Sequence, residues 1–456
     1  MNNVYKYLKY AITGTDKTEN KHDMSVFMKS EELASEYDIK YDGETFISED
    51  NSLADSVFKA AIELLTSEGI YCIDTGKTIK IDEEDILKSL DTTEMLEIGR
   101  FKEKVIVPYR YTMDSEPPVI IGGPMGGTVS EEHFLEVHLS SAIEPIVQGV
   151  YAGVIEKMGG EGIKGKSPFE MLAALKEARL TRLATKLAGR EGLALMGPGT
   201  PTISPAYMVV STEELYSGAD PQEVYQLDEL KTNYETFYKS IFHMARGNHF
   251  LSGQCPIFGG PSIGSAAGLA IVDVAETIQS KILTGASLHV SGAVHVNTNS
   301  SSTKEILWAS NLASIAISRN FHHYTARYYW NLAGCCTDMM FYETAAQAIG
   351  DTISGRDLLI GPVGGRGAGV DQSTGLESRF MGEISHMATS LSISEANDII
   401  SKIYAKYENR LSNAPAGKKF SDCYIVNSEY EMRPTDEYLQ LYREICNEIK
   451  GYCSTE

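Results

Sequence analysis

Four short apolar runs along the chain end in glycine and proline. They are PPVIIGGPMGG (117–127), GLALMGPGT (192–200), QCPIFGGP (254–261) and DLLIGPVGGRG (357–367). Each run has the length of a buried strand, stops at a tight turn and precedes a segment with helical periodicity. Strands that alternate with helices and end in glycine-rich turns are typical of parallel α/β folds, in which the strand tips form the functional site.

Weaker strand candidates fill the intervals at suitable distances. They are PIVQGVYAGVI (145–155), GASLHVSGAVHV (285–296) and ARYYWNLAG (326–334), with helix-patterned stretches such as 167–189 between them. The seven candidates have the spacing of βα units, and an eight-stranded barrel needs about 250 residues. We therefore predict the α/β class and a TIM (β/α)8 barrel over residues 116–392.

A doubly wound open sheet is the main structural alternative. That fold carries a GxGxxG turn at the start of a helix, with an acidic residue about twenty positions later. GGPMGG at 122–127 is only a weak look-alike, and GPVGGRG at 361–367 has an arginine where such a loop usually stays small. No dinucleotide cofactor is expected.

The segments that flank the barrel have different patterns. Residues 50–69 have helical periodicity with a polar start signal and a glycine stop, and 69–86 alternates like a short hairpin before an acidic helix. We predict an N-terminal extension over 1–115, which covers the bottom of the barrel or builds an oligomer interface. Residues 393–456 are predicted as a C-terminal helical segment, interrupted by a loop at 413–424.

Composition and charge narrow the function classes. The hydrophobic content of 43% supports a large core, and the net charge of −22 argues against nucleic acid as a partner. No apolar stretch reaches the length of about 18 residues that a membrane span needs, and the first fourteen residues lack the apolar core of a signal peptide. We expect a cytoplasmic protein.

Cysteine and histidine give no metal signature. The seven cysteines form no CxxC pattern, and the ten histidines no HExxH pattern. The adjacent Cys335 and Cys336 have no further ligand at finger spacing. We expect reduced thiols, no metal site and no cofactor bound to this chain.

Several segments carry a family resemblance. SEGIYCIDTGKTIKIDEEDI, GKSPFEMLAALKEARL, QLDELK, PIFGG, SGRDLL, STGLESRFMGE and SNAPAGKKFSDCY occur in order between about residues 30 and 440. They resemble the monomethylamine:corrinoid methyltransferases of methylotrophic methanogens. The resemblance implies a TIM barrel, methyl transfer from an amine to the Co(I) of a separate corrinoid protein, and a hexamer.

The resemblance also implies where the site lies, and the chain departs from the family there. The position of the family's pyrrolysine is taken by Met196, and that of its carboxylate by Gly253, next to Gln254. The family's glutamine corresponds to Arg327, whereas Tyr329 is retained. A thioether cannot add an amine as a pyrroline ring can, so free monomethylamine is not the expected substrate.

The changed residues favour a betaine-like donor. Loss of an anion at Gly253 and gain of a cation at Arg327 suit a carboxylate, and aromatic rings can hold a quaternary ammonium. The expected catalytic residues are Met196, Gly253, Gln254, Arg327 and Tyr329; the expected substrate-binding residues are Tyr328, Trp330, Phe258, Arg366, His295 and Glu377.

Structural roles remain alternatives for these residues. Met196 can simply fill the core, the YYW cluster can be core packing, and Arg327 can pair with Asp338 or Glu343. Two other functions also remain open. One is methyl transfer from a small methylamine without a carboxylate, and the other is an anion-binding barrel that lacks methyltransferase activity.

Overall fold

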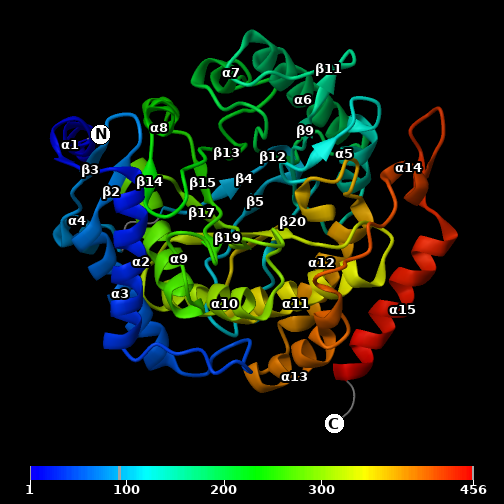
Figure 1. Cartoon of the computed structure of the whole chain (residues 1–456). Helices are drawn as coiled ribbons and strands as arrows, with labels where there is room; N and C mark the ends of the chain where they lie inside the picture. The colour runs from blue at the N-terminus through cyan, green and yellow to red at the C-terminus, as the bar shows by residue number, and fades with distance from the viewer. Residues whose placement is uncertain (1, 91–93, 454–456) are drawn as a thin grey trace.

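The computed structural model describes residues 2–90 and 94–453, and its centre is a barrel of eight parallel strands. Figure 1 shows the strands enclosed by helices. The strands are β6 (Val119–Gly122), β8 (Gly149–Tyr151), β12 (Ala194–Met196), β13 (Gln222–Glu223), β15 (Phe250–Gln254), β17 (Leu288–Ser291), β19 (Tyr324–Trp330) and β20 (Leu358–Val363). The predicted TIM barrel is therefore confirmed.

A single bridge closes the barrel between β12 and β13. It joins Gly197 to Gln222, and the Glu223 N–H donates to the Gly197 carbonyl at 2.6 Å. All other neighbours pair as parallel strands. The carboxyl ends of the eight strands therefore meet at one end of the barrel, where the site of such folds lies.

A helix follows each strand and covers the outside of the barrel. The helices are α5 (Phe134–Ala142), α6 (Pro168–Leu187), α7 (Ser204–Met208), α8 (Tyr234–Arg246), α9 (Ala266–Gln279), α10 (Lys304–Asn320), α11 (Asp338–Ser354) and α12 (Gly375–Ala388). Helix α6 lies within the predicted helical stretch 167–189, and in the structure Ser167 is its N-cap and proline lies in its first turn.

Two strand positions differ from the prediction. The run at 254–261 is not the barrel strand, because β15 ends at Gln254, the first residue of the run, and the rest of the run contains only the short β16 (Ile257–Phe258). Strand β13 has no counterpart among the seven candidates. It is only two residues long and lies in the polar segment PQEVYQL, which has no strand pattern.

The N-terminal segment closes the amino end of the barrel. Leu96, Ile98 and Val107, around the hairpin of β4 (Glu97–Ile98) and β5 (Val105–Ile106), belong to the interior cluster of the barrel. The predicted helix and hairpin before it are α3 (Asn51–Glu68), with caps Asp50 and Gly69, and β2 (Ile70–Cys72) with β3 (Lys77–Ile79). One expected role of this segment, covering the bottom of the barrel, is thus observed.

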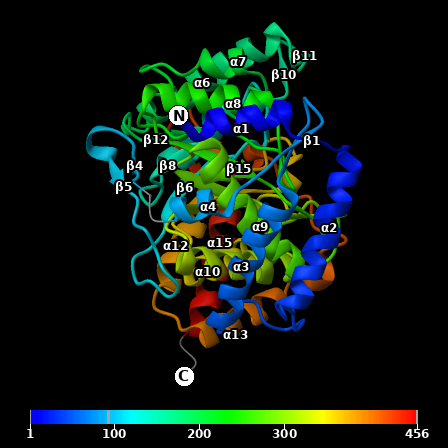
Figure 2. The same cartoon turned by 90° about the vertical axis from the view of Figure 1, so that its left-hand side faces the viewer.

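Further elements of the N-terminal segment lie on the outer helices. Figure 2 shows α1, α2 and α3 on the side of the barrel, and α2 and α3 contact α9. These remaining elements are α1 (Asn2–Thr13), β1 (Thr15–Asp16), α2 (Glu19–Glu36) and α4 (Glu83–Ser89). Strand β14 (Lys231–Thr232), which precedes α8, pairs with β2 and ties the segment to the barrel.

Helices of the C-terminal segment pack on the opposite side (Figure 1). They are α13 (Ile393–Tyr404), α14 (Phe420–Cys423) and α15 (Asp436–Cys453), with the hairpin of β21 (Tyr424–Val426) and β22 (Met432–Pro434) between α14 and α15. Both α13 and α15 contact α11. The boundaries at 115 and 392 remain a prediction, because both flanking segments share one core with the barrel helices.

Candidate active site

The carboxylate of Glu223 lies at the centre of the barrel mouth. The hydroxyl of Tyr328 donates to Oε1 and that of Tyr151 donates to Oε2. The two tyrosines come from β19 and β8, on either side of the barrel from β13. Three distant parts of the chain therefore converge on one carboxylate.

Gly253 provides the space for that carboxylate. A Cβ atom at residue 253 would lie 2.1 Å from Oε1 of Glu223 and 3.0 Å from the Tyr328 hydroxyl. Any larger residue would displace the glutamate side chain. The expected loss of negative charge at this position is therefore corrected: a carboxylate is present in the site, and it comes from the neighbouring strand β13.

Aromatic rings form a wall next to Glu223. The Tyr328 ring lies edge-on to that of Tyr151 at 5.8 Å and to that of Trp330 at 6.1 Å. Gly292, which follows β17, allows this packing because a Cβ there would lie within 3.1 Å of Tyr328, Trp330 and Cys255. Three electron-rich rings thus lie in a row beside the carboxylate.

A pocket of 310 Å³ opens beside Glu223. The segments after β12 and β13 form two of its walls, and α8 forms the third. Its lining residues are Pro198, Gly199, Pro201, Thr202, Glu223, Tyr225, Leu227, Asn233, Glu235 and Lys239. The carboxylate is therefore accessible to a small molecule from this side.

Burial determines the protonation of Glu223. Removal from water raises the pKa of this carboxyl to about 7, against the opposing effects of the Tyr328 hydrogen bond and the Lys239 charge. The group thus titrates in the physiological range. A ligand cation would favour the ionised form, since an opposite charge nearby stabilises a carboxylate.

Arg327 does not point into the pocket. Interior side chains of β19 are those of Tyr324, Ala326 and Tyr328, so the intervening Arg327 faces the helices. It is fully buried, its Nη1 lies 3.4 Å from Asp351 on α11, and its Nη2 donates to the Ser301 carbonyl at 2.7 Å. The expected contact between Arg327 and a ligand is therefore not formed. The sequence alternatives, Asp338 and Glu343, are not its partners either.

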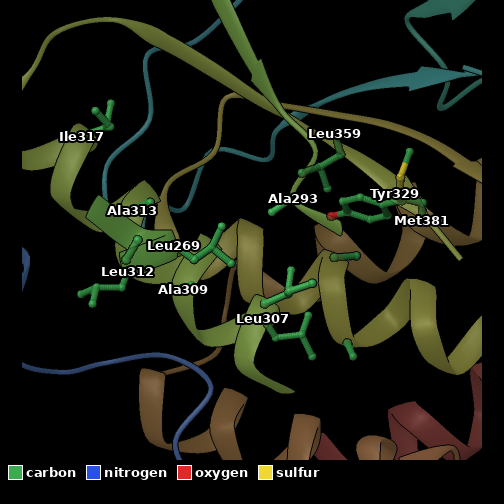
Figure 3. Close-up of a cluster of buried hydrophobic side chains, with 14 of the residues drawn as sticks. Leu269, Ala293, Leu307, Ala309, Leu312, Ala313, Ile317, Tyr329, Leu359 and Met381 are labelled. Carbon is green, nitrogen blue, oxygen red and sulfur yellow. The ribbon is translucent and has the colours of Figure 1, made fainter. Parts of the chain in front are cut away.

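The same alternation places Tyr329 and Gln254 outside the barrel. Figure 3 shows Tyr329 among apolar residues of the layer between strands and helices, with Leu359 and Met381 nearby. Gln254 is fully buried and donates to the Leu227 carbonyl at 2.8 Å. Neither side chain faces the barrel interior, in contrast to Tyr328, which belongs to the interior cluster, and Trp330, which packs against it.

Met196 lies at the tip of β12 and faces the barrel interior. It is fully buried and belongs to the same interior cluster as Tyr151 and Tyr328. Its carbonyl accepts from the Tyr216 hydroxyl at 3.3 Å. The position at the strand tip agrees with the expectation, and its correspondence to pyrrolysine remains a prediction.

Four further expected residues lie away from Glu223. Phe258 and His295 face each other at 5.6 Å on the ribbon of β16 and β18 (Val294–His295), beyond the strand tips. Arg366 is exposed in a turn after β20, with φ of 63°. Glu377 on α12 is buried and accepts from the hydroxyls of Thr374 and Tyr438, so it joins α12 to α15. The structure does not bring these residues to the pocket.

Sequence reasoning missed Glu223, Tyr151 and Lys239. Glu223 lies in a strand too short to have a periodic pattern. Tyr151 lies within the predicted run 145–155, and its position at the strand tip was the only available signal. Lys239 lies in the middle of α8, where lysine is usually a solvated surface residue.

Metal-ligating clusters and membrane-spanning helices are both absent from the part of the chain that the structure describes. In residues 2–90 and 94–453, no group of three or more His, Cys, Asp or Glu side chains is arranged to hold a metal ion. No helix in these ranges has the length and apolar character needed to cross a membrane.

Comparison with known proteins identifies the family. The profile of monomethylamine methyltransferase MtmB matches residues 2–453. Monomethylamine methyltransferase MtmB2 of Methanosarcina barkeri (strain Fusaro) and MtmB1 of Methanosarcina acetivorans are each 35% identical over 440 residues, which cover 96% of this chain and 95% of each relative. The crystal structure of Methanosarcina barkeri MtmB and that of a hydroxylamine MtmB complex each superpose with a TM-score of 0.94 at 33% identity, covering 98% of both chains. This chain therefore belongs to the monomethylamine methyltransferase MtmB family.

Proposed function

We propose that this protein transfers a methyl group from a methylated ammonium compound to the Co(I) of a corrinoid carried by a separate protein. Membership in the MtmB family supports the reaction class. The methyltransferases that the sequence resembles pass the methyl group to a separate corrinoid protein, and we propose the same acceptor here. A hexamer remains an expectation from that resemblance.

The observation that carries the proposal is the Glu223 carboxylate beside three aromatic rings. A methylated ammonium group is a cation with an apolar surface, so it is attracted both by a carboxylate and by ring faces. Each cation–π contact contributes about 0.5–2 kcal/mol. Glu223, Tyr328 and Trp330 together provide both kinds of attraction at the strand tips.

The proposed donor is a quaternary ammonium or betaine-like compound. In the transfer, the electron pair of Co(I) forms the new bond to the methyl carbon. The electrons of the broken C–N bond remain on nitrogen, and a neutral amine leaves. A quaternary nitrogen needs no proton for this step, so no acid is required in the pocket.

The role that follows for Glu223 is binding and orientation. The positive charge on nitrogen decreases as the C–N bond breaks, so attraction by Glu223 does not increase toward the transition state. Its contribution comes from holding the methyl group in line with the acceptor. Good orientation of two reactants can lower the activation barrier by up to about 7–11 kcal/mol.

A second candidate donor is monomethylamine itself. The names of the relatives, and the hydroxylamine complex of one of them, favour a small amine. The N–H groups of such a donor would form hydrogen bonds to Glu223, in place of contacts between methyl groups and the aromatic rings.

A donor panel distinguishes the two candidates. The protein is mixed with a reduced corrinoid protein and choline, glycine betaine or monomethylamine, and the conversion of Co(I) to methyl-Co(III) is followed by absorbance. The proposal expects conversion with a quaternary donor. Conversion with monomethylamine alone would support the second candidate, and no conversion with any donor would refute both.

A further inference from the structure

A buried lysine lies in the same pocket as Glu223. Lys239 on α8 is 6% exposed and is one of the residues that line the 310 Å³ pocket. Its Nζ donates to the carbonyls of Pro201 at 3.2 Å and Thr202 at 3.1 Å, and it lies 5.1 Å from the centre of the Tyr207 ring. An ammonium group has three N–H donors, so one remains after these two hydrogen bonds.

Lys239 has no ion-pair partner in the described structure. Among residues 2–90 and 94–453, no carboxylate oxygen lies within 4.0 Å of its Nζ, and the charges of Glu235, Glu170 and Glu223 act on it only from a greater distance. Each of these three carboxylates accepts hydrogen bonds from other donors, Glu223 from Tyr151 and Tyr328. Glu235 accepts from the N–H and hydroxyl of Ser204, and Glu170 accepts from the N–H groups of Thr202 and Ile203. A buried ammonium with no carboxylate in direct contact is costly, and an anion from a ligand that contacts it would offset part of that cost.

The pocket is therefore lined by an ammonium, Lys239, and by two carboxylates, Glu223 and Glu235, of which Glu235 is hydrogen-bonded to Ser204. It is also large for a methylamine. Two non-hydrogen atoms need roughly 60 Å³, if each takes the space of about 30 Å³ that a water molecule has in the liquid. A molecule with a cation and an anion, separated by one or a few carbon atoms, matches both the charges and the volume.

We infer that Lys239 binds the carboxylate of a zwitterionic methyl donor whose methylated ammonium group lies against Glu223. The inference rests on the proposed function and names its substrate class, N-methylated amino acids of the betaine type. It assigns to Lys239 the carboxylate recognition that the sequence placed at Arg327. Arg327 is already neutralised by Asp351 in the outer layer.

Calorimetric titration of the full chain with glycine betaine and choline tests this assignment. The two probes share a trimethylammonium group, and choline has a hydroxyl in place of the carboxylate. The wild type is expected to bind glycine betaine about tenfold or more tightly than choline. Lys239→Met should remove this preference by weakening glycine betaine about tenfold or more, with choline unchanged, because a charge-assisted hydrogen bond is lost.

Two variants control the titration. Lys239→Arg keeps a cation and should retain most of the preference. Lys186→Met changes an exposed lysine on α6 that is outside this pocket, and should bind both probes as the wild type does. Thermal unfolding of each variant establishes that it is folded.

Three outcomes would overturn the assignment: choline binding as tightly as glycine betaine, full glycine betaine affinity in Lys239→Met, or no binding of either probe by the wild type. The titration needs no corrinoid protein and no turnover. Specific binding of glycine betaine without methyl transfer would therefore refute the proposed function and leave the role of Lys239 intact.

Discussion

The Tyr328 hydroxyl donates a hydrogen bond to Oε1 of Glu223 across the mouth of the barrel. This contact joins β19 to β13 through the barrel interior. It exists because residue 253, on the strand next to β13, is a glycine, and the glutamate takes the volume that a side chain there would fill. Glu223 is therefore the centre of the site, and its charge, its position and its neighbours determine what mutations there should do.

Binding of a quaternary cation should depend on pH through Glu223. Its pKa of about 7 in the unliganded protein means that the group is protonated below pH 7 and ionised above it. Choline affinity should therefore be constant above about pH 8 and fall, by up to about tenfold per pH unit, below pH 7. Tyr151, Tyr328 and Lys239 also face this carboxyl; burial raises the pKa of Tyr328 and lowers that of Lys239. Titration calorimetry between pH 5.5 and 8.5 measures the midpoint, and Glu223→Gln should show no such transition.

Two adjacent tyrosines should respond differently to loss of their hydroxyls. Tyr328→Phe removes a hydrogen bond that favours the ionised form of Glu223. If that bond contributes about 1.5 kcal/mol, the midpoint of choline binding rises by about one pH unit. Tyr329→Phe changes a side chain in the outer layer (Figure 3) and should leave the midpoint unchanged. Equal shifts in both variants would contradict the observed alternation of β19.

Gly253→Ala should displace the carboxylate without unfolding the barrel. The added methyl group would lie 2.1 Å from Oε1 of Glu223, so the side chain must move. We expect a loss of stability of about 1–3 kcal/mol, as for other overpacked sites, and a weakening of choline binding by about tenfold or more. Gly162→Ala is the matched control, because no atom lies within 4 Å of the position that its methyl group would take. Unchanged affinity in Gly253→Ala would show that the position of Glu223 is not critical.

Arg327→Met should reduce stability and leave ligand specificity intact. Arg327 and Asp351 are both fully buried. A second arginine, Arg356, lies 3.8 Å from Asp351 and 3.7 Å from Asp273. Removing one charge of a buried pair typically costs about 3–5 kcal/mol. Denaturant unfolding measures this loss, and the double variant with Asp351→Leu should recover part of it because both charges are removed. Selective loss of glycine betaine binding in folded Arg327→Met would restore Arg327 as a ligand contact.

The barrel was predictable because its strands are apolar runs with glycine-rich ends. Long regular helices such as α3 and α6 also follow from their caps and periodicity. Strand β13 is different. It contributes two residues and is held by neighbours on both sides, through Gly197 and through Phe250 and Leu251. A strand fixed by tertiary pairing alone leaves no hydrophobic pattern in the sequence.

The site was harder to predict because the side-chain alternation of a strand has a period of two. A shift of one residue exchanges the two faces. The sequence predicted that the segment ARYYWN belongs to the site, and in the structure Arg327 and Tyr329 face the helices whereas Tyr328 and Trp330 face the barrel. The local sequence does not show which alternate residues of this strand face the barrel interior, since both faces of the strand are buried.

Single-turnover methyl transfer with wild type and Glu223→Gln tests the central claim most directly. The measurement follows the absorbance change from Co(I) to methyl-Co(III) in a reduced corrinoid protein at pH 8, with glycine betaine as donor. We predict conversion by the wild type and a loss of kcat/KM in Glu223→Gln that corresponds to about 2–5 kcal/mol, the range for removing one member of a buried charge pair. Equal rates for both proteins, or no conversion by the wild type with this or any other methylated ammonium donor, would contradict the account.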